Sequence, residues 1–252
     1  MKLSVVILSK NEEKNINNAI ESASFANEIL VIDDNSTDDT TTIAVKAGAK
    51  VIRRKLNNNF SSQRNYGIQE AKGDWILFLD ADEIISKELQ KEIGKTLNNS
   101  KNSVYYIKRR DIFWGRGLKY GELWNSYRKG FIRLVKKDSG LWKHPIHETY
   151  DYKGSFGRLD GFINHYSHNG IKDFIQKVNK YSSIRAKELN NRGNSTNIFK
   201  IFIYPIGKFK VNYLFKLGFL DGIPGFIYAF MMSFHSFLVR AKLYQYTKLS
   251  SK

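Results

Sequence analysis

Apolar runs and amphipathic stretches alternate along the first hundred residues. Leu3–Leu8 is a continuous apolar run, which is typical of a strand buried on both faces. Apolar residues then recur at helical spacing from Ile16 to Ala23. The alternation continues with strands expected at 28–32, at 51–52 and at 75–79, and with helices expected after Ser36 and at 61–71. This order predicts an α/β fold, with a mostly parallel central sheet and helices on both faces.

The pattern changes after residue 100. We expect strands at 104–108 and 131–135, and a helix at 171–189 that is ended by Gly193. Residues 198–252 are aromatic, apolar and basic, with eight Lys and Arg against one acidic residue. The sequence therefore predicts three segments: residues 1–100 and 101–197 as the two halves of one domain, and residues 198–252 as a C-terminal helical extension.

The composition narrows the class of protein. The chain of 252 residues is 42% hydrophobic and 26% charged, which is typical of a globular domain with some additional structure. It has no cysteine, which excludes disulfides and thiolate metal sites, so a metal must be held by oxygen or histidine. The first apolar run is too short for a signal peptide, and we expect the protein to be cytoplasmic.

The charge of the chain is large and unevenly distributed. The formal net charge is +17, yet residues 1–100 hold 13 Lys and Arg against 15 Asp and Glu, and all of the excess lies beyond them. A basic surface attracts the phosphates of nucleotides, nucleic acids or anionic lipids. The alternative interpretation is a solvated basic face without a partner.

Polar residues follow the predicted strands at the edge where ligands of such sheets bind. Ser9, Asn11 and Glu12 follow the first strand without a Gly-rich turn, so neither a P-loop nor a dinucleotide fingerprint is present. Asp33 and Asp34 follow the second strand and are suited to accept hydrogen bonds from a base or a ribose. The alternative role is helix capping, for which Ser36 is sufficient.

The strongest local signal is Asp80-Ala81-Asp82, which follows the apolar strand at 75–79. Two carboxylates about 4 Å apart would repel each other by roughly 4 kcal/mol at an effective dielectric near 20. A divalent cation removes this repulsion and can bridge the carboxylates to a diphosphate. An Asp-x-Asp triplet alone is weak evidence, because it also occurs by chance in surface loops.

Taken together, these residues resemble a known family. In order and spacing the chain is similar to family 2 glycosyltransferases and to the nucleotide-sugar domain of their GT-A fold over about residues 1–100. The matching motifs are Ser4-Val5-Val6-Ile7, Asn11-Glu12, Val31-Ile32-Asp33-Asp34-Asn35-Ser36-Thr37-Asp38, Arg64-Asn65-x-Gly67, and Gly73-Asp74-x-x-x-x-Leu79-Asp80-Ala81-Asp82-Glu83.

The resemblance implies roles for the matching residues. Residues 1–100 would bind a nucleotide-diphosphate sugar, and residues 101–197 would face the acceptor. Asp80 and Asp82 would face Mg²⁺ or Mn²⁺ and the diphosphate, with Asp82 as the more direct ligand. The implied nucleotide-sugar residues are Ser9, Asn11, Glu12, Asp33, Asp34, Arg64, Asn65, Asp80 and Ala81.

The second half resembles a narrower group, the lipopolysaccharide-core glucosyltransferase-like members of family 2. The motifs are His144-Pro145-x-His147-Glu148, Asn164-His165-Tyr166-Ser167 and Gly218-Phe219-x-Asp221-Gly222-x-x-Gly225. An inverting transfer needs one general base, and the resemblance points to Glu148, with Asp160 or Asp221 as alternatives. The alternative role for Glu148 is a salt bridge at a strand end. His165 is a candidate third metal ligand or a structural histidine. The implied acceptor is a glycan or lipid-linked glycan of the cell envelope, such as lipopolysaccharide core.

The C-terminal extension contains an uncharged apolar run, Gly222–Val239, whose length is at the lower limit for a membrane span. Bulky aromatics mixed with Lys and Arg surround it, which favours a segment that lies on an anionic membrane surface. The alternatives are a helical pair packed on the domain and a true span. We expect association with the inner face of the cell membrane.

The sequence thus predicts an inverting, metal-dependent, hexosyltransferase-like enzyme with no nucleic-acid partner. A metal-dependent nucleotidyltransferase is the rival enzyme, but it would usually carry a Gly- and Lys-rich phosphate loop after the first strand. A basic nucleic-acid- or membrane-binding module without catalysis is the rival of another class. The acidic triplet argues against nucleic acid, because it would repel a phosphate backbone.

Overall fold

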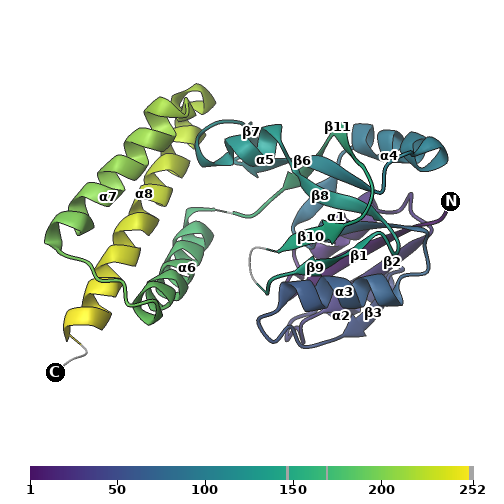
Figure 1. Ribbon diagram of the computed structural model, residues 1–252, viewed down its shortest axis with the longest axis horizontal. Coiled ribbons are helices and arrows are strands. Elements are labelled where there is room, and N and C mark those ends of the chain that lie inside the picture. Colours follow the sequence, from purple (N-terminus) through teal and green to yellow (C-terminus); the bar gives the residue numbers. More distant parts are fainter. Residues whose placement is uncertain (146–147, 169, 250–252) are drawn as a thin grey trace. The chain divides into compact units, whose positions relative to one another are not determined.

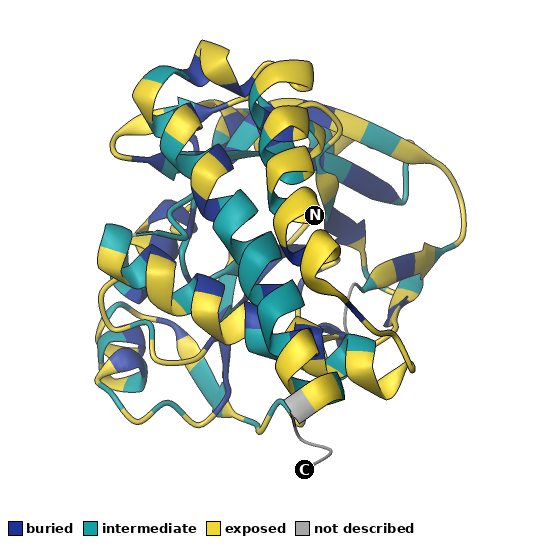
Figure 2. Ribbon diagram, turned by 90° about the vertical axis from the view of Figure 1, so that its left-hand side faces the viewer, coloured by how far each residue is buried: buried dark blue, intermediate teal, exposed yellow. Residues whose placement is uncertain are grey.

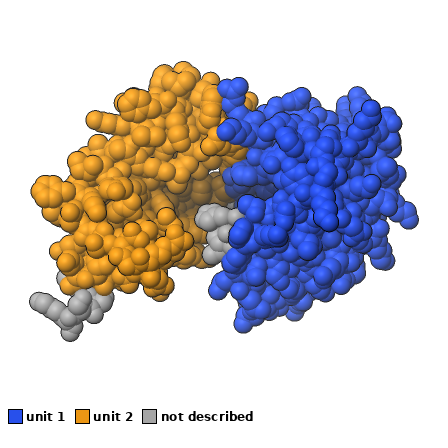
Figure 3. Space-filling model, in the orientation of Figure 1, with its two compact units in different colours: residues 1–110, 128–165 blue, residues 111–127, 166–252 orange. Residues whose placement is uncertain are grey.

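The computed structural model describes residues 1–145, 148–168 and 170–249, which fold into two compact units (Figure 3). Unit 1 comprises residues 1–110 with 128–165, and unit 2 comprises residues 111–127 with 166–252. These boundaries differ from the three predicted segments at 1–100, 101–197 and 198–252. Composition does not reveal that residues 111–127 pack with helices that come much later in the chain.

Unit 1 is built on a mixed sheet with the strand order β3-β2-β1-β4-β8-β6-β11-β5 (Figure 1). Four strands pair in parallel, as predicted: β1 (Leu3–Ser9), β2 (Glu28–Asp33), β3 (Lys50–Arg53) and β4 (Trp75–Asp80). The sheet continues through β8 (Phe131–Lys136), β6 (Val104–Phe113), β11 (Phe156–His165) and β5 (Glu83–Ile85). The pairs β4–β8, β6–β8 and β5–β11 are antiparallel, so the parallel part makes up one half of the sheet.

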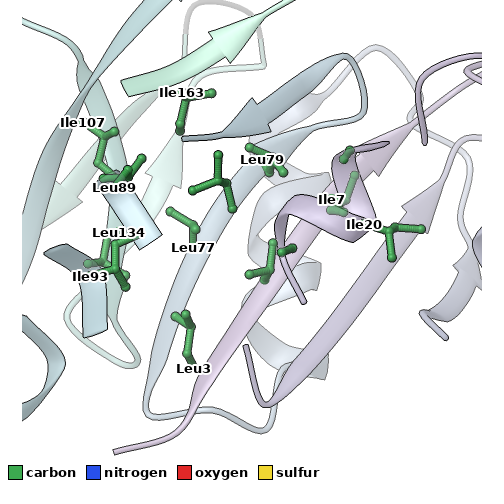
Figure 4. Close-up of a cluster of buried hydrophobic side chains, with 14 of the residues drawn as sticks. Leu3, Ile7, Ile20, Leu77, Leu79, Leu89, Ile93, Ile107, Leu134 and Ile163 are labelled. Atoms are coloured by element: carbon green, nitrogen blue, oxygen red, sulfur yellow. The ribbon is translucent and has the colours of Figure 1, made fainter. Parts of the chain in front are cut away.

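Helices cover both faces of this sheet, which confirms the predicted α/β class. Alternate side chains of β1 point to opposite faces, so Val5 packs with the helices α1 (Ile16–Ser22), α2 (Thr40–Lys46) and α4 (Lys87–Asn99). Figure 4 shows part of this cluster, with Ile20 of α1 and Leu89 of α4 beside strand residues.

The opposite face carries α3 (Phe60–Glu70) and a separate hairpin of β9 (Gly140–Lys143) and β10 (Thr149–Tyr152). Ile68 of α3 and Trp142 of β9 join the second apolar cluster. Gly67 allows α3 to approach the sheet, because a Cβ at this position would lie 2.5 Å from the Val6 side chain. This close approach brings the middle of α3 next to the strands.

Unit 2 is mainly helical. Its long helices are α6 (Ile171–Asn191), α7 (Ile198–Lys210) and α8 (Gly222–Tyr244), and α8 packs against both of the others (Figure 1). Its shorter elements are β7 (Arg116–Leu118), η1 (Gly121–Leu123), the start of α5 (Trp124–Arg128), η2 (Val211–Phe215), η3 (Gly218–Asp221) and η4 (Gln245–Leu249). The predicted helix at 171–189 is confirmed, and Gly193 follows it with a positive φ of 73°. The continuous helical stretch Gly218–Lys248 is long and apolar enough to cross a membrane by length and composition.

Candidate active site

The polar residues after β1 and β2 lie together at one edge of the sheet, because Ser9 and Asp33 are register partners. The Ser9 hydroxyl donates to Asp33 Oδ1 at 3.0 Å, and the Ser36 amide donates to Asp33 Oδ2 at 2.8 Å. Asp33 is fully buried. The Asp33 carboxylate therefore joins the two loops. Its position is compatible with the alternative role in capping a helix and also with binding a nucleotide.

Asp34 lies beside Asp33 and carries a stabilised negative charge. Burial raises the pKa of Asp34, but hydrogen bonds from Lys10 and from the Leu56 amide outweigh this effect, so the pKa lies below its usual value. The Lys10 Nζ atom is 2.6 Å from Asp34 Oδ2, and the Leu56 amide is 2.8 Å from Oδ1. Asp34 is thus ionised at neutral pH and is held by groups from two further loops.

Asn11 and Glu12 connect the loop after β1 to the start of α2. Asn11 has a left-handed backbone with a φ of 54°, a conformation that asparagine tolerates better than most residues. Its Oδ1 accepts a hydrogen bond from the Thr37 amide at 2.9 Å. The Glu12 amide donates to Thr40 Oγ1 at 2.7 Å. The predicted residues Ser9, Asn11, Glu12, Asp33 and Asp34 therefore form one connected group.

Arg64 of α3 links the first carboxylate of the triplet to the predicted general base. Its Nη2 lies 3.1 Å from Asp80 Oδ1, and its Nε lies 3.4 Å from Glu148 Oε1. The guanidinium is nearly buried and packs over the rings of Phe78 and Trp142. Asp80 and Glu148, which are far apart in sequence, are therefore neighbours of the same cation.

Arg133 of β8 completes the arrangement, and it was not among the residues predicted from the sequence. Its Nη2 lies 3.1 Å from Asp80 Oδ2 and 2.7 Å from Glu83 Oε1. The strand at 131–135 is otherwise apolar, so an arginine in its middle was the available signal of a buried ion pair. Glu83 is fully buried, and its second oxygen accepts the Asp80 amide at 3.0 Å.

This network determines the charge states at the end of β4. Burial would raise the pKa of Asp80, but Arg133 and Arg64 hold it far below its usual range. Burial raises the pKa of Glu83, although Arg133 opposes the shift. Two arginines thus balance the charge of Asp80. Repulsion between Asp80 and Asp82 therefore does not by itself require a metal ion.

Asp82 and His165 form a second pair on the other side of Ala81. The His165 Nε2 atom lies 3.3 Å from Asp82 Oδ2, and both side chains are partly exposed. Two ligands that are each about 2.1 Å from one octahedral ion lie about 3 Å apart, so this separation fits a shared cation. Ala81 is small and buried, and its amide donates to the Leu8 carbonyl at 3.2 Å.

The fit to a metal ion rests on this pair alone. Within residues 1–145, 148–168 and 170–249, no group of three or more His, Cys, Asp and Glu side chains is close enough to form a complete metal site. Both Asp80 oxygens already accept hydrogen bonds from arginine. An ion held by Asp82 and His165 would need further oxygen ligands, which a diphosphate could supply.

The alternative bases lie in different surroundings. Asp160 has a side chain that is 92% exposed and pairs with Lys108 on the surface of unit 1. Asp221 is buried in unit 2 and accepts hydrogen bonds from the Lys119 and Tyr120 amides. Glu148 is the candidate that contacts the Arg64–Asp80 pair. His147, which belongs to the same motif, lies outside the described residues.

The side chain of Asn65 is hydrogen-bonded to the backbone of β9. Its Oδ1 accepts the Trp142 amide at 2.8 Å, and its Nδ2 donates to the Trp142 carbonyl at 2.9 Å. Asn65 thus connects α3 to Trp142 of β9. Glu148 follows β9 in the sequence. A cavity of about 430 Å³ lies between the two elements, and Asn65, Tyr66 and Trp142 are among the residues that line it.

Comparisons with known proteins find relatives over most of the chain. Residues 4–150 match the model of glycosyl transferase family 2. An uncharacterized glycosyltransferase of Rickettsia typhi is 32% identical over 256 residues, covering 96% of this chain and 86% of that protein. The lipopolysaccharide core biosynthesis glycosyltransferase LpsC of Rhizobium meliloti is 27% identical and covers 99% of this chain and 94% of its own length.

A solved structure shares the fold. The crystal structure of S. aureus TarS 1-349 in complex with UDP-GlcNAc aligns with a TM-score of 0.52 and 16% identity, over 98% of this chain and 91% of that one. The predicted GT-A-type fold is confirmed, and the enzyme class is that of a glycosyltransferase rather than a nucleotidyltransferase or a binding module. The chain belongs to glycosyltransferase family 2.

Proposed function

We propose that this glycosyltransferase transfers a sugar from a nucleotide-diphosphate donor to a hydroxyl group with inversion at the anomeric carbon. The observation that carries this proposal is the contact of Arg64 with both Asp80 and Glu148. Through this contact the Glu148 carboxylate lies near the end of β4, where ligands of such sheets bind.

The donor would lie across the ends of β1, β2 and β4. Asp34, which is ionised, and the neighbouring Asp33 would accept hydrogen bonds from the base or the ribose. Ser9, Asn11 and Glu12 would form the wall of this site, and Arg64 would face the diphosphate. The UDP-GlcNAc complex of TarS, which has the same fold, supports a nucleotide-sugar donor of this kind.

Asp82 and His165 would hold the divalent cation, Mg²⁺ or Mn²⁺. Such an ion supplies positive charge that stabilises a leaving diphosphate. The donor set of one carboxylate and one imidazole suits Mn²⁺, and a mainly oxygen set completed by phosphates suits Mg²⁺. Asp80 then serves to orient Arg64 and Arg133, while its backbone positions Asp82.

Glu148 would act as the general base. Its carboxylate accepts the proton of the acceptor hydroxyl as the hydroxyl oxygen attacks the anomeric carbon. The bond between that carbon and the diphosphate oxygen breaks on the opposite face of the sugar, so one displacement inverts the configuration. The Arg64 Nε atom orients the Glu148 carboxylate for this step.

The acceptor would be a cell-envelope glycan or a lipid-linked glycan, met at the cytoplasmic side of the membrane. The name and coverage of LpsC support a lipopolysaccharide-core type of acceptor. The parts of unit 1 that follow residue 100, including β9, β10 and Glu148, would form the acceptor side.

A donor screen followed by product analysis tests this function. Nucleotide-diphosphate sugars are screened with Mn²⁺ for hydrolysis or transfer, and the anomeric configuration of the early product is read by proton NMR. The expected result is one preferred donor and a product of inverted configuration. A product that retains the donor configuration would contradict the role of Glu148 as a base.

A further inference from the structure

Large apolar side chains are exposed along α7 and the turns that follow it. Phe199 is 75% exposed, Ile203 64%, Phe215 79% and Ile223 73%. Ile201 is the one buried residue of α7. Figure 2 shows that much of the helical surface facing the viewer is exposed. Many large apolar side chains exposed in one segment indicate a site that binds an apolar partner.

The exposed charged residues on this surface are all positively charged. Lys200, Lys210 and Lys216 are exposed among the apolar side chains. Asp221 is the sole acidic residue between 198 and 249, and it is buried with its carboxylate bound to two backbone amides. The exposed charge of this segment is therefore wholly positive, which complements an anionic layer and not a neutral protein groove.

Contacts within unit 2 distinguish a helix that lies on a membrane from one that crosses it. The Lys242 Nζ atom donates to the Asn179 carbonyl and side-chain oxygens of α6 at 2.7 and 2.6 Å. The Ser233 hydroxyl donates to the Pro205 carbonyl of α7 at 2.7 Å. A spanning α8 would have to separate from α6 and α7 and give up these hydrogen bonds.

We propose that the exposed face of α7, η2 and the first turns of α8 docks on an anionic membrane leaflet without crossing it. Phe199, Phe215 and Ile223 enter the boundary between headgroups and acyl chains, and the lysines lie at the level of the lipid phosphates. This surface belongs to unit 2 and does not depend on the transfer chemistry of unit 1. Docking on a membrane would bring the enzyme to a lipid-linked acceptor, as the proposed function expects. The docking proposal is tested separately from the transfer reaction.

Vesicle sedimentation with the full-length protein tests the proposal. Vesicles of phosphatidylcholine with one-third phosphatidylglycerol are compared with vesicles of phosphatidylcholine alone. We expect binding to the anionic vesicles, and at least tenfold weaker binding in high salt because exposed charges are screened. The triple variant Lys200→Glu, Lys210→Glu, Lys216→Glu and the double variant Phe199→Ser, Phe215→Ser should each weaken binding at least tenfold.

Matched controls separate docking from general charge and apolar effects. Lys87→Glu, Lys91→Glu, Lys95→Glu makes the same charge change on α4 of unit 1, and Ile175→Ser, Tyr181→Ser removes exposed apolar side chains from α6. Both controls should bind as the wild type does. Circular dichroism and the thermal midpoint should be unchanged in all four variants, because every altered side chain is exposed.

Four outcomes would overturn the proposal. The first is that the protein does not bind anionic vesicles. The second is that the Lys87, Lys91, Lys95 variant loses as much binding as the Lys200, Lys210, Lys216 variant. The third is a bound fraction that resists high salt and alkaline wash, which would show a spanning helix. The fourth is a wild-type dimer that Phe199→Ser, Phe215→Ser converts to a monomer while vesicle binding is unchanged, which would show that a second copy covers the surface.

Discussion

At the scale of single residues, the site is an alternating cluster of arginines and carboxylates. Arg64 contacts Asp80 and Glu148, and Arg133 contacts Asp80 and Glu83. Most of these groups are removed from water, so each charge depends on its partner and not on solvent. The cluster therefore fixes the positions of these side chains in the proposed donor site before any ligand binds.

The first prediction concerns Arg133. Arg133→Met keeps an unbranched side chain but removes the guanidinium, which leaves the Glu83 and Asp80 carboxylates without this partner. Loss of one member of a buried ion pair typically costs about 3–5 kcal/mol, and we expect this decrease in the free energy of unfolding in urea. Arg192→Met removes a surface pair with Glu188 and should cost less than about 1 kcal/mol. Equal stability of the two variants would contradict the account.

The second prediction concerns pH. The folded-state pKa of Asp80 is lowered, so its contribution to stability is complete above the unfolded pKa of about 3.9 and is lost as the pH falls below it. Unfolding free energies measured between pH 5 and pH 2 should therefore decrease less steeply for Asp80→Asn than for the wild type. The expected difference in slope approaches one proton, or about 1.4 kcal/mol per pH unit. Parallel curves would mean that Asp80 is not stabilised as a carboxylate.

The third prediction concerns Glu148. Glu148→Gln retains the shape of the side chain but cannot accept a proton, so kcat should fall by about 10²–10⁴ while the donor Kd changes little. Glu70→Gln removes a carboxylate from the surface of α3, where it pairs with Lys50, and should leave both values unchanged. Loss of donor affinity together with kcat would assign Glu148 to the donor site instead.

At the scale of elements, α3 supports both sides of the site. Arg64 points to the end of β4, and Asn65 holds the backbone of β9 with two hydrogen bonds. The Phe60 amide also donates to the Pro145 carbonyl at 3.0 Å. The position of Glu148 thus depends on how firmly the segment after β9 is attached to this helix.

The fourth prediction tests this attachment. Asn65→Ala leaves the amide and carbonyl of Trp142 without their side-chain partners, which should lower the free energy of unfolding by about 1–3 kcal/mol. Because Glu148 follows the same segment, kcat should decrease more than donor affinity does. Glu70→Gln changes a surface residue of α3 outside the cavity and should affect neither quantity. A donor affinity that falls as much as kcat would place Asn65 in the nucleotide pocket.

The elements that could be predicted are those with strong local patterns. β1, β2 and β4 are buried on both faces and appear in the sequence as continuous apolar runs, and the carboxylates that follow β2 and β4 were found for this reason. The hairpin of β9 and β10 and the strand β5 are short and mixed in polarity, so no pattern marks them. Arg133 was missed because its role arises from the pairing of β8 with β4, which no local sequence feature specifies.

At the scale of the whole molecule, the two units differ in the charged residues that they carry. Unit 1 contains the strand ends with their carboxylates, while unit 2 carries the exposed basic and aromatic segment after residue 198. The uneven charge was visible in the sequence, but the assignment of residues 111–127 to the helical unit was not. That assignment depends on Phe113, Leu118 and Leu123, which pack with α6 and α8.

The central claim is that a nucleoside diphosphate and a divalent cation bind at the joined ends of β1, β2 and β4. Calorimetric titration of nucleoside diphosphates with Mn²⁺ into the wild type, Asp82→Asn and the surface variant Asp151→Asn tests it most directly. We predict that one nucleoside diphosphate binds the wild type and Asp151→Asn equally, and that Asp82→Asn or excess chelator weakens its affinity at least tenfold. Binding that is indifferent to both Asp82 and the cation, or no binding of any nucleoside diphosphate, would contradict the account.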